Sequence, residues 1–230
     1  MKINGASVAT VAVVTLLSFL AGTSDAQGYD FFHLVMQWPP AVCNQPRSNC
    51  RAGIPRTFTI HGMWPMTNRG GSPQNCPGRV RDVRSSGRVD RGTLGAMDRQ
   101  WPNLKRGGRD PNSQFWTHEW NTHGTCSRMT LQNYFRRAVD RAASVDLLRL
   151  LRSNRIQPDN RSYRRGDIGA ALHRYNPVVK CNDVRSGGRT YKQIHEIRVC
   201  VSRSGNSVVS CGGGGPAFRS CGNGDIRFSR

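Results

Sequence analysis

Two short segments hold the side chains of this chain that are best suited to proton transfer. The first, residues 60–65, reads Ile-His-Gly-Met-Trp-Pro. The second, residues 115–126, reads Phe-Trp-Thr-His-Glu-Trp-Asn-Thr-His-Gly-Thr-Cys. Together they carry three of the six histidines and one of the two glutamates: His61, His118, Glu119 and His123. Because imidazole gives and accepts protons near neutral pH, these motifs predict a site for general acid–base catalysis.

Spacing within the second segment argues against a zinc protease. The protease motif His-Glu-x-x-His puts both imidazoles on one helix face, whereas His118 and His123 are separated by about 140° around a helix axis. Glu119 and His123 do share a face. A carboxylate beside an imidazole raises the pKa of the imidazole and orients its ring. We therefore predict that Glu119 supports His123 and that the site needs no metal or other cofactor.

The charge balance narrows the range of substrates. Lys and Arg total 34 against 14 Asp and Glu, the formal net charge is +20, and most of the cations are Arg. Such a surface attracts polyanions, and guanidinium groups bind phosphate through two hydrogen bonds. Metal-free RNA cleavage needs a base for the 2′-OH, an acid for the leaving 5′ oxygen, and donors or cations near the phosphate. Single-stranded RNA is thus the predicted partner, with an acidic cell-wall glycan as the alternative.

Residues 1–26 have the features of a secretory signal peptide: a positive start at Lys2, an apolar run at residues 8–21, and small residues before a cut after Ala26. The remaining residues, 27–230, are expected to form one soluble domain, because no second apolar run could span a membrane. All eight cysteines lie there, which predicts a disulfide framework and an extracellular location. Asn160 begins the one N-glycosylation sequon.

Hydrophobic patterning predicts strands early and late in the chain and helices between them. A helix is expected over residues 113–123, ended by Gly124, and one or two helices over residues 131–151, with Ser144 as a cap. Residues 67–95 are typical of an exposed loop with at most short helices. The arrangement favours an α+β fold over a wound parallel sheet. Strands are expected at residues 29–38, 56–60 (with His61 at its end), 190–201 and 207–210, and a glycine-rich loop at 212–215.

Both motifs resemble those of the T2 ribonuclease family, which are similar to His-Gly-Leu-Trp-Pro and His-Glu-Trp-x-Lys-His-Gly-Thr-Cys. Residues 29–40 resemble the opening strand of that family, and residues 101–104 its Trp-Pro-Asn segment. The resemblance implies an α+β single domain with a central antiparallel sheet packed by several helices and held by four disulfides. It also implies their pairing: Cys43–Cys50, Cys76–Cys126, Cys181–Cys221 and Cys200–Cys211.

The same resemblance implies a role for each site residue. His61 would donate a proton to the leaving oxygen, His123 would accept the proton of the 2′-OH, and His118 and Glu119 would bind and polarise the phosphate. The family usually has a Gln where this chain has His33, which leaves base preference open. The substrate-binding residues would be His33, Trp64, Asn103, Leu104, Phe115 and Thr122. We interpret His173, His195 and Trp120 as structural residues.

One departure from the family pattern bears on rate. The family usually has Lys immediately before the last catalytic histidine, and this chain has Thr122 there. A hydroxyl can donate a hydrogen bond to the phosphate but brings no charge. We therefore expect slower cleavage than in a relative that has the Lys, unless a nearby Arg takes its place.

The strong basicity resembles the plant stylar S-RNases, the female determinants of gametophytic self-incompatibility. That resemblance implies a pollen-side recognition protein as a second partner, for which residues 67–95 are a candidate surface, and a monomeric enzyme. The alternatives are a secreted T2 ribonuclease for phosphate scavenging or defence, and a catalytically weakened basic binding protein.

Overall fold

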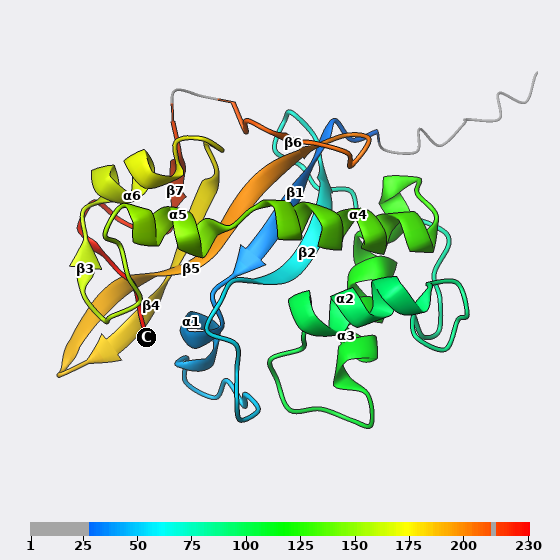
Figure 1. Cartoon of the computed structure of the whole chain (residues 1–230), viewed down its shortest axis with the longest axis horizontal. Coiled ribbons are helices and arrows are strands. Elements are labelled where there is room, and N and C mark those ends of the chain that lie inside the picture. Colours follow the sequence, from blue (N-terminus) through cyan, green and yellow to red (C-terminus); the bar gives the residue numbers. More distant parts are fainter. Residues whose placement is uncertain (1–27, 213–214) are drawn as a thin grey trace, which may run out of the picture.

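A central sheet organises the fold, and α4 and α5 run across one of its faces (Figure 1). The computed structural model describes residues 28–212 and 215–230, so the predicted signal peptide (1–26) and residues 213–214 of the predicted glycine-rich loop lie outside the described residues. The strands are β1 (Phe31–Gln37), β2 (Thr59–Met66), β3 (Ser162–Tyr163), β4 (Val178–Ser186), β5 (Arg189–Ser202), β6 (Val208–Val209), β7 (Ala217–Arg219) and β8 (Ile226–Arg227).

The helices lie mostly between the second and fourth strands, as the sequence predicts for an α+β protein. Within the described residues, none of them is long and apolar enough to cross a lipid bilayer. They are α1 (Pro39–Cys43), α2 (Arg91–Gln100), α3 (Pro111–Thr122), the 3₁₀ turn η1 (Gly124–Ser127), α4 (Leu131–Ser144), α5 (Leu147–Ser153) and α6 (Arg165–Leu172).

The main path of the sheet has the order β2-β1-β5-β4-β7. Its central pairs, β1 with β2, β1 with β5 and β4 with β5, are antiparallel. Two short strands depart from that pattern, since β7 runs parallel to β4 and β8 runs parallel to β5. The predicted α+β single domain with a central antiparallel sheet is confirmed, with parallel strands added at the margins.

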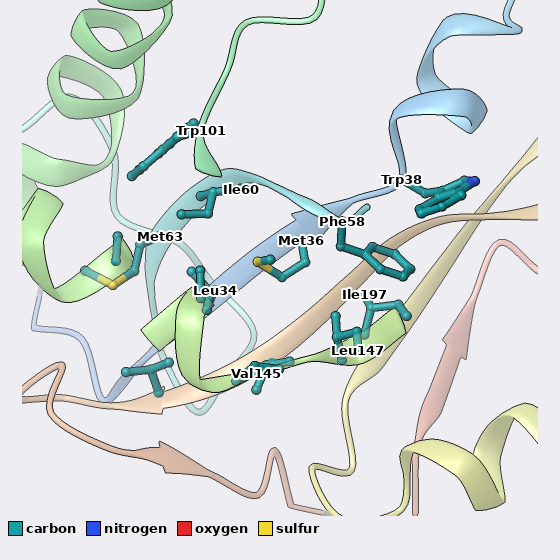
Figure 2. Packing of buried hydrophobic residues seen from close by; sticks show 14 of the residues in the cluster. Leu34, Met36, Trp38, Phe58, Ile60, Met63, Trp101, Val145, Leu147 and Ile197 are labelled. Carbon is teal, nitrogen blue, oxygen red and sulfur yellow. The ribbon is translucent and has the colours of Figure 1, made fainter. Parts of the chain in front are cut away.

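Alternate residues of the sheet enter the hydrophobic core, because successive side chains of a strand point to opposite faces. On β1, Leu34 and Met36 pack with Ile60 of β2, Ile197 of β5 and Leu147 of α5 (Figure 2). The residues between them belong to the other face. Register places His33 opposite Trp64 and Cys200, and Gln37 opposite Glu196. One face of the sheet is thus apolar core, and the other carries the polar chemistry.

Helix α3 carries most of the second motif and has well-defined ends. Asp110 caps it by accepting a hydrogen bond from the Ser113 amide at 3.0 Å, and Pro111 occupies the first turn. At the other end the His123 amide donates to the Glu119 carbonyl at 2.9 Å. A side chain at Gly124 would overlap the Trp120 ring, so glycine lets the chain leave the helix against that ring. The predicted helix over residues 113–123 is therefore confirmed.

Two local predictions were wrong. The second strand does not end before His61; β2 continues through the whole first motif, with a register shift between Val35 and Met36 of β1 opposite it. Ser144 does not cap α5; Asp146 does, and it accepts from the Arg149 amide at 3.0 Å. Residues 91–95, at the end of the predicted loop with at most short helices, form the first half of α2.

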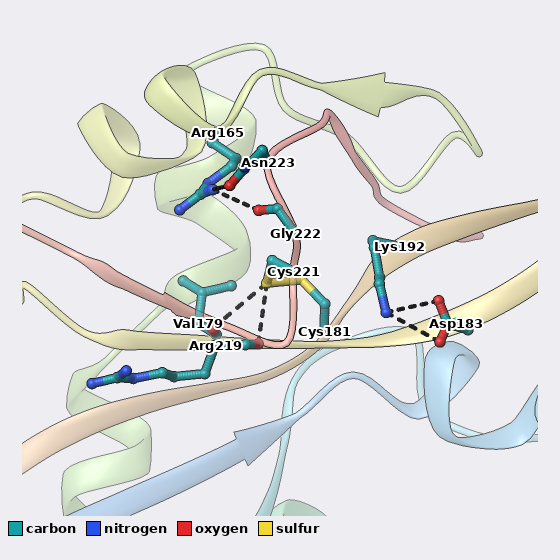
Figure 3. The surroundings of a disulfide bond; sticks show 9 residues. All are labelled: Arg165, Val179, Cys181, Asp183, Lys192, Arg219, Cys221, Gly222 and Asn223. Atoms are coloured by element: carbon teal, nitrogen blue, oxygen red, sulfur yellow. Dashed lines mark hydrogen bonds and ion pairs between the residues drawn. A yellow bond between two sulfur atoms is a disulfide. The ribbon is translucent and has the colours of Figure 1, made fainter.

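All eight cysteines are paired, in the pattern that the resemblance implies. Cys181–Cys221 ties β4 to the segment that follows β7, beside the contacts of Arg165 with Gly222 and Asn223 (Figure 3). Cys76–Cys126 joins the loop after β2 to η1, directly after His123. This bond anchors the end of the second motif.

Removing Cys76–Cys126 should strongly destabilise the fold. Its sequence separation of 50 is the largest of the four disulfides. Loop-closure entropy then predicts that C76A/C126A loses about 4 kcal/mol of unfolding free energy, to be measured by urea denaturation. The matched control C43A/C50A opens a loop of separation 7 and should lose about 2 kcal/mol. An equal loss in both variants would contradict the loop-entropy account.

Candidate active site

His61 is held on both its backbone and its ring. The Trp101 indole donates to the His61 carbonyl, with Nε1 2.9 Å from the oxygen. Nδ1 of the His61 ring lies 2.8 Å from Oε1 of Glu196 on β5. Because an ionised carboxylate only accepts, Nδ1 carries the hydrogen of this bond. Nε2 is therefore the ring atom left for a substrate, and the side chain is 32% exposed.

The surroundings of His61 favour its protonated form. Burial alone would lower the pKa of the ring, but the hydrogen bond with Glu196 and the charges of Glu119 and Glu196 outweigh burial, while Arg198 opposes them weakly. The net result is a pKa raised above the ordinary value of 6.5. His61 is thus set to carry a proton near neutral pH, as a proton donor must.

Trp64 joins the two motifs. Its indole Nε1 donates to Oε2 of Glu119 at 2.9 Å, and its ring stacks on His123 with centroids 4.9 Å apart and planes 25° from parallel. A side chain at Gly62 would overlap both the Trp64 indole nitrogen and the Glu119 carboxylate. The glycine of the first motif therefore makes room for the contact that brings α3 onto β2.

His123 lies in surroundings that favour its neutral form. Only 7% of the residue is exposed, and within the described part of the chain its Nδ1 has no hydrogen-bond partner. Burial, followed by the charges of His118 and His61, lowers the pKa of His123 to about 4. A neutral imidazole can accept a proton. The lowered pKa of His123 suits it to act as a base, and the raised pKa of His61 suits that residue to act as an acid.

The prediction that Glu119 supports His123 was wrong. The Glu119 carboxylate bonds to Trp64, and among the described contacts no side-chain hydrogen bond joins it to His123. The residue is 2% exposed, and burial raises the pKa of Glu119 to about 7, although the charge of His61 and the Trp64 bond act the other way. The carboxylate that supports a histidine is instead Glu196, and the histidine is His61.

His118 and Thr122 lie one helical turn apart on α3. His118 is exposed, and its charge acts on His123. Thr122 is half-buried, and its carbonyl accepts from the Asn75 amide at 2.8 Å. The helix thus offers one imidazole and one hydroxyl to a ligand. Where the family pattern has a positively charged Lys, this chain has the uncharged Thr122.

A cavity of about 450 Å³ opens beside His61. The Asn103 side chain is held there by its bond to the Pro111 carbonyl at 2.9 Å, and the Phe115 ring lies 5.9 Å from the His61 ring. This volume and its apolar walls with a few polar groups suit a nucleobase-sized ligand. The lining includes Gln37, His61, Asn103, Leu104, Phe115 and His195.

His33 is not placed in this cavity. It is 9% exposed, faces Trp64 and Cys200 across the strands, and has its pKa lowered to about 4 by burial and then by the charge of Arg198. Gln37, four residues later on the same face, lines the cavity instead. The prediction that His33 binds substrate stays a prediction, and the structure places Gln37, not His33, at the cavity.

Three further residues of the site come from β5. His195, interpreted from sequence as structural, lines the cavity, Glu196 bonds to His61, and the Arg198 guanidinium lies 4.8 Å from the Trp64 ring centroid. A signal existed in the sequence. Glu196 and Arg198 alternate with Ile197 and Val199, so a strand puts the two charges on the polar face.

Comparison with known proteins agrees with this geometry. The chain is 34% identical over 221 residues to the extracellular ribonuclease LE of Solanum lycopersicum, covering 92% of this chain and 93% of that protein. It is 33% identical over 220 residues to ribonuclease S-5 of Pyrus pyrifolia, covering 92% of each. The crystal structure of RNase NT in complex with 5′-AMP superposes with a TM-score of 0.71 and 32% identity, over 88% of this chain and 99% of that one.

A family profile matches most of the described chain as well. The match runs over residues 29–211 and is to the Ribonuclease T2 family. It spans both motifs and all of β5. Two histidines whose pKa values are shifted in opposite directions both contact Trp64. With ribonuclease relatives along nearly its whole length and a family profile over residues 29–211, the chain belongs to the ribonuclease T2 family.

Proposed function

We propose that this protein is an endoribonuclease that cleaves single-stranded RNA by transesterification without a metal ion. One observation carries the proposal: His61 and His123, both in contact with Trp64, have pKa values shifted in opposite directions. An acid and a base that act in the same reaction need such a difference.

The mechanism follows from those two protonation states. Neutral His123 accepts the proton of the 2′-OH while O2′ forms a bond to phosphorus. The bond from phosphorus to O5′ breaks, and protonated His61 delivers its proton from Nε2 to that oxygen. The products are a 2′,3′-cyclic phosphate end and a free 5′-OH. His118 and Glu119 contact the phosphate, where Glu119, with a pKa of about 7, donates a hydrogen bond in its protonated form.

The cavity beside His61 receives a base. Phe115 offers a ring face for stacking, and Gln37 and Asn103 offer amides for hydrogen bonds to base edges. His195 and Lys105 add a second imidazole and a cation to its rim. The net charge of +20 then attracts the polyanionic substrate from any direction.

The first test is cleavage of single-stranded RNA by the oxidised protein in excess EDTA, with the product ends identified. Accumulation of 2′,3′-cyclic phosphate ends supports the proposal. Cleavage that stops in EDTA contradicts the metal-free mechanism. Failure of well-folded protein to cleave favours instead the catalytically weakened binding protein, which would retain RNA affinity.

Thr122→Lys should raise the cleavage rate. The new ammonium would stand one helical turn from His118 and stabilise charge on the phosphate oxygens, so we expect kcat to rise about tenfold, a modest share of the 10²–10³ assigned to one fixed donor. The measurement is kcat on a dinucleotide substrate. Thr122→Gln, which adds length without charge, is the control and should leave kcat within about twofold.

The biological role that we favour is that of a secreted S-RNase in self-incompatibility. Strong basicity supports it, as does similarity to ribonuclease S-5. Ribonuclease LE is equally similar, which keeps a phosphate-scavenging or defence role as the alternative. Asn160, exposed and with a positive φ of 69°, is accessible for glycosylation on the secretory route. Arrest of self but not non-self pollen tubes by added protein would support the S-RNase role, and arrest of neither would contradict it.

A further inference from the structure

We propose that Glu196 and Arg198 of β5 form a positioning pair that holds the His61 ring with Nε2 toward the substrate and sets the charge around it. The proposal rests on the proposed ribonuclease function and adds a third chain segment to its acid–base machinery. Neither residue lies in the two motifs, and β5 is separated from β2 by β1.

The Glu196 carboxylate uses both of its oxygens. Oε1 accepts from His61 Nδ1 at 2.8 Å. Oε2 accepts from Arg198 twice, from Nε at 3.1 Å and from Nη2 at 2.8 Å. The carboxylate cannot rotate without breaking one of these contacts, and so it fixes the plane and the tautomer of the imidazole.

Burial makes this arrangement more than a surface ion pair. The side chains of Glu196 and Arg198 are 4% and 17% exposed. Removing an Arg–Glu pair from water is costly, and hydrophobic replacement is often neutral or stabilising. A pair placed here for stability alone would not need His61, yet the imidazole is the third member of the network. The Arg198 guanidinium also lies over Trp64, the residue that contacts Glu119 and His123.

The groups that face His61 come from three elements. Glu196, Arg198 and His195 lie on β5, Glu119 lies on α3, and His123 lies in the turn between α3 and η1. Lys180 of β4 is the register partner of Glu196. Burial would raise the pKa of Glu196, but His61 and Arg198 lower it to about 2, so the carboxylate stays ionised through the working range. Glu196 then favours protonation of His61, and Arg198 disfavours it. The two residues therefore shift the pKa of His61 in opposite directions.

The test is a ¹⁵N and ¹³C NMR titration of the histidine rings, with kcat measured on the same samples. In Glu196→Gln the pKa of His61 should fall, and kcat should fall about tenfold to a hundredfold, less than the 10²–10⁴ given by a general acid as a whole. In Arg198→Gln the pKa of His61 should rise. KM should change less than threefold in both, since neither residue is expected to contact the substrate.

Asp183→Asn is the matched control. Asp183 of β4 pairs with Lys192 of β5 at 2.9 Å (Figure 3). Both side chains are exposed, and neither residue is among the groups that shift the pKa of His61. This variant should leave the His61 titration and kcat unchanged. An unchanged His61 pKa in Glu196→Gln would overturn the role of Glu196, and an unchanged or lower one in Arg198→Gln would overturn that of Arg198.

The wild-type protein gives an independent readout if a variant fails to fold. Neutral His61 should be the Nδ1–H tautomer, and its pKa should lie above 6.5. The Nε2–H tautomer, or a lower pKa, would overturn the proposal. Because NMR titration needs no substrate, a wild-type protein that cleaves no RNA would refute the proposed function and still decide whether the pair positions His61.

Discussion

Replacing His61 with alanine should lower kcat for RNA cleavage by about 10² to 10⁴, the range found for one general acid or base. The same loss is expected for His123→Ala. His61 would otherwise donate to the leaving oxygen, and His123 would accept the 2′-OH proton, so each variant lacks one of the two proton transfers. Since both groups act in one step, the double variant should lose little more than either single variant.

The pH dependence should assign the two roles. In kcat/KM, activity should rise as His123 loses its proton, with a pKa of about 4, and fall as His61 loses its proton above pH 6.5. His123→Ala should remove the acidic limb. His61→Ala should remove the part of the basic limb that belongs to His61 and leave the part due to loss of the Glu119 proton near pH 7. Exchange of the limbs would show that the donor and acceptor assignments are reversed.

His173→Ala is the matched control for both variants. His173 is an exposed histidine at the end of α6, outside both motifs. Its replacement removes the same side chain from the protein and should leave the whole pH profile in place. A comparable loss of activity in His173→Ala would mean that histidine content, and not the site described above, limits cleavage.

The elements that position the site could be predicted where local patterns were strong. Alternation of apolar residues identified β1 and β5, and the histidine motif with its following glycine identified α3. Missed elements had weak local patterns. Half of β4 is a polar hairpin arm, and α2 contains two glycines and a short apolar face. In both, contacts with the rest of the fold stabilise the element more than its own sequence does.

The partners of His61 and His123, the proposed catalytic histidines, could not be predicted for a different reason. Helical spacing suggested Glu119 for His123, but His123 lies at the helix end, where the side chain turns to Trp64. Glu196 is 135 residues from His61 in sequence and reaches it only because β5 and β2 both flank β1. Such a pairing depends on strand order and on the register shift opposite His61, neither of which the residues near His61 encode.

Glu119→Gln should make the protein more stable at pH 8 and less active at pH 5, where Glu119 is protonated. The folded pKa of Glu119 is about 7 against an ordinary 4.5, because burial disfavours the carboxylate. A carboxyl whose pKa is raised on folding stabilises fully below the unfolded pKa and loses that contribution as pH rises through the folded pKa. Wild-type stability should therefore fall between about pH 4.5 and above pH 7 by roughly 2–3 kcal/mol from this group.

The amide cannot ionise, so the Glu119→Gln variant should lack that loss. It should exceed the wild type in unfolding free energy at pH 8 by about 1–3 kcal/mol and match it within about 0.5 kcal/mol at pH 4, measured by urea denaturation. Its activity at pH 5 should fall by less than the 10²–10³ given for loss of a whole donor, because the amide N–H still donates a hydrogen bond but is a weaker acid than the carboxyl O–H that it replaces.

Asp140→Asn is the control that separates the effect of Glu119 burial from a general gain in stability on removing any carboxylate. Asp140 is 54% exposed on α4, four residues from Arg136, and its replacement should change stability by less than about 0.5 kcal/mol at either pH. Equal stability of Glu119→Gln and wild type at pH 8 would show that Glu119 is not strained by burial. Higher stability together with lower activity would instead show that the active site lowers the unfolding free energy of the protein through this one carboxyl group. Glu119 would then be kept buried against Trp64 because it must meet the phosphate there.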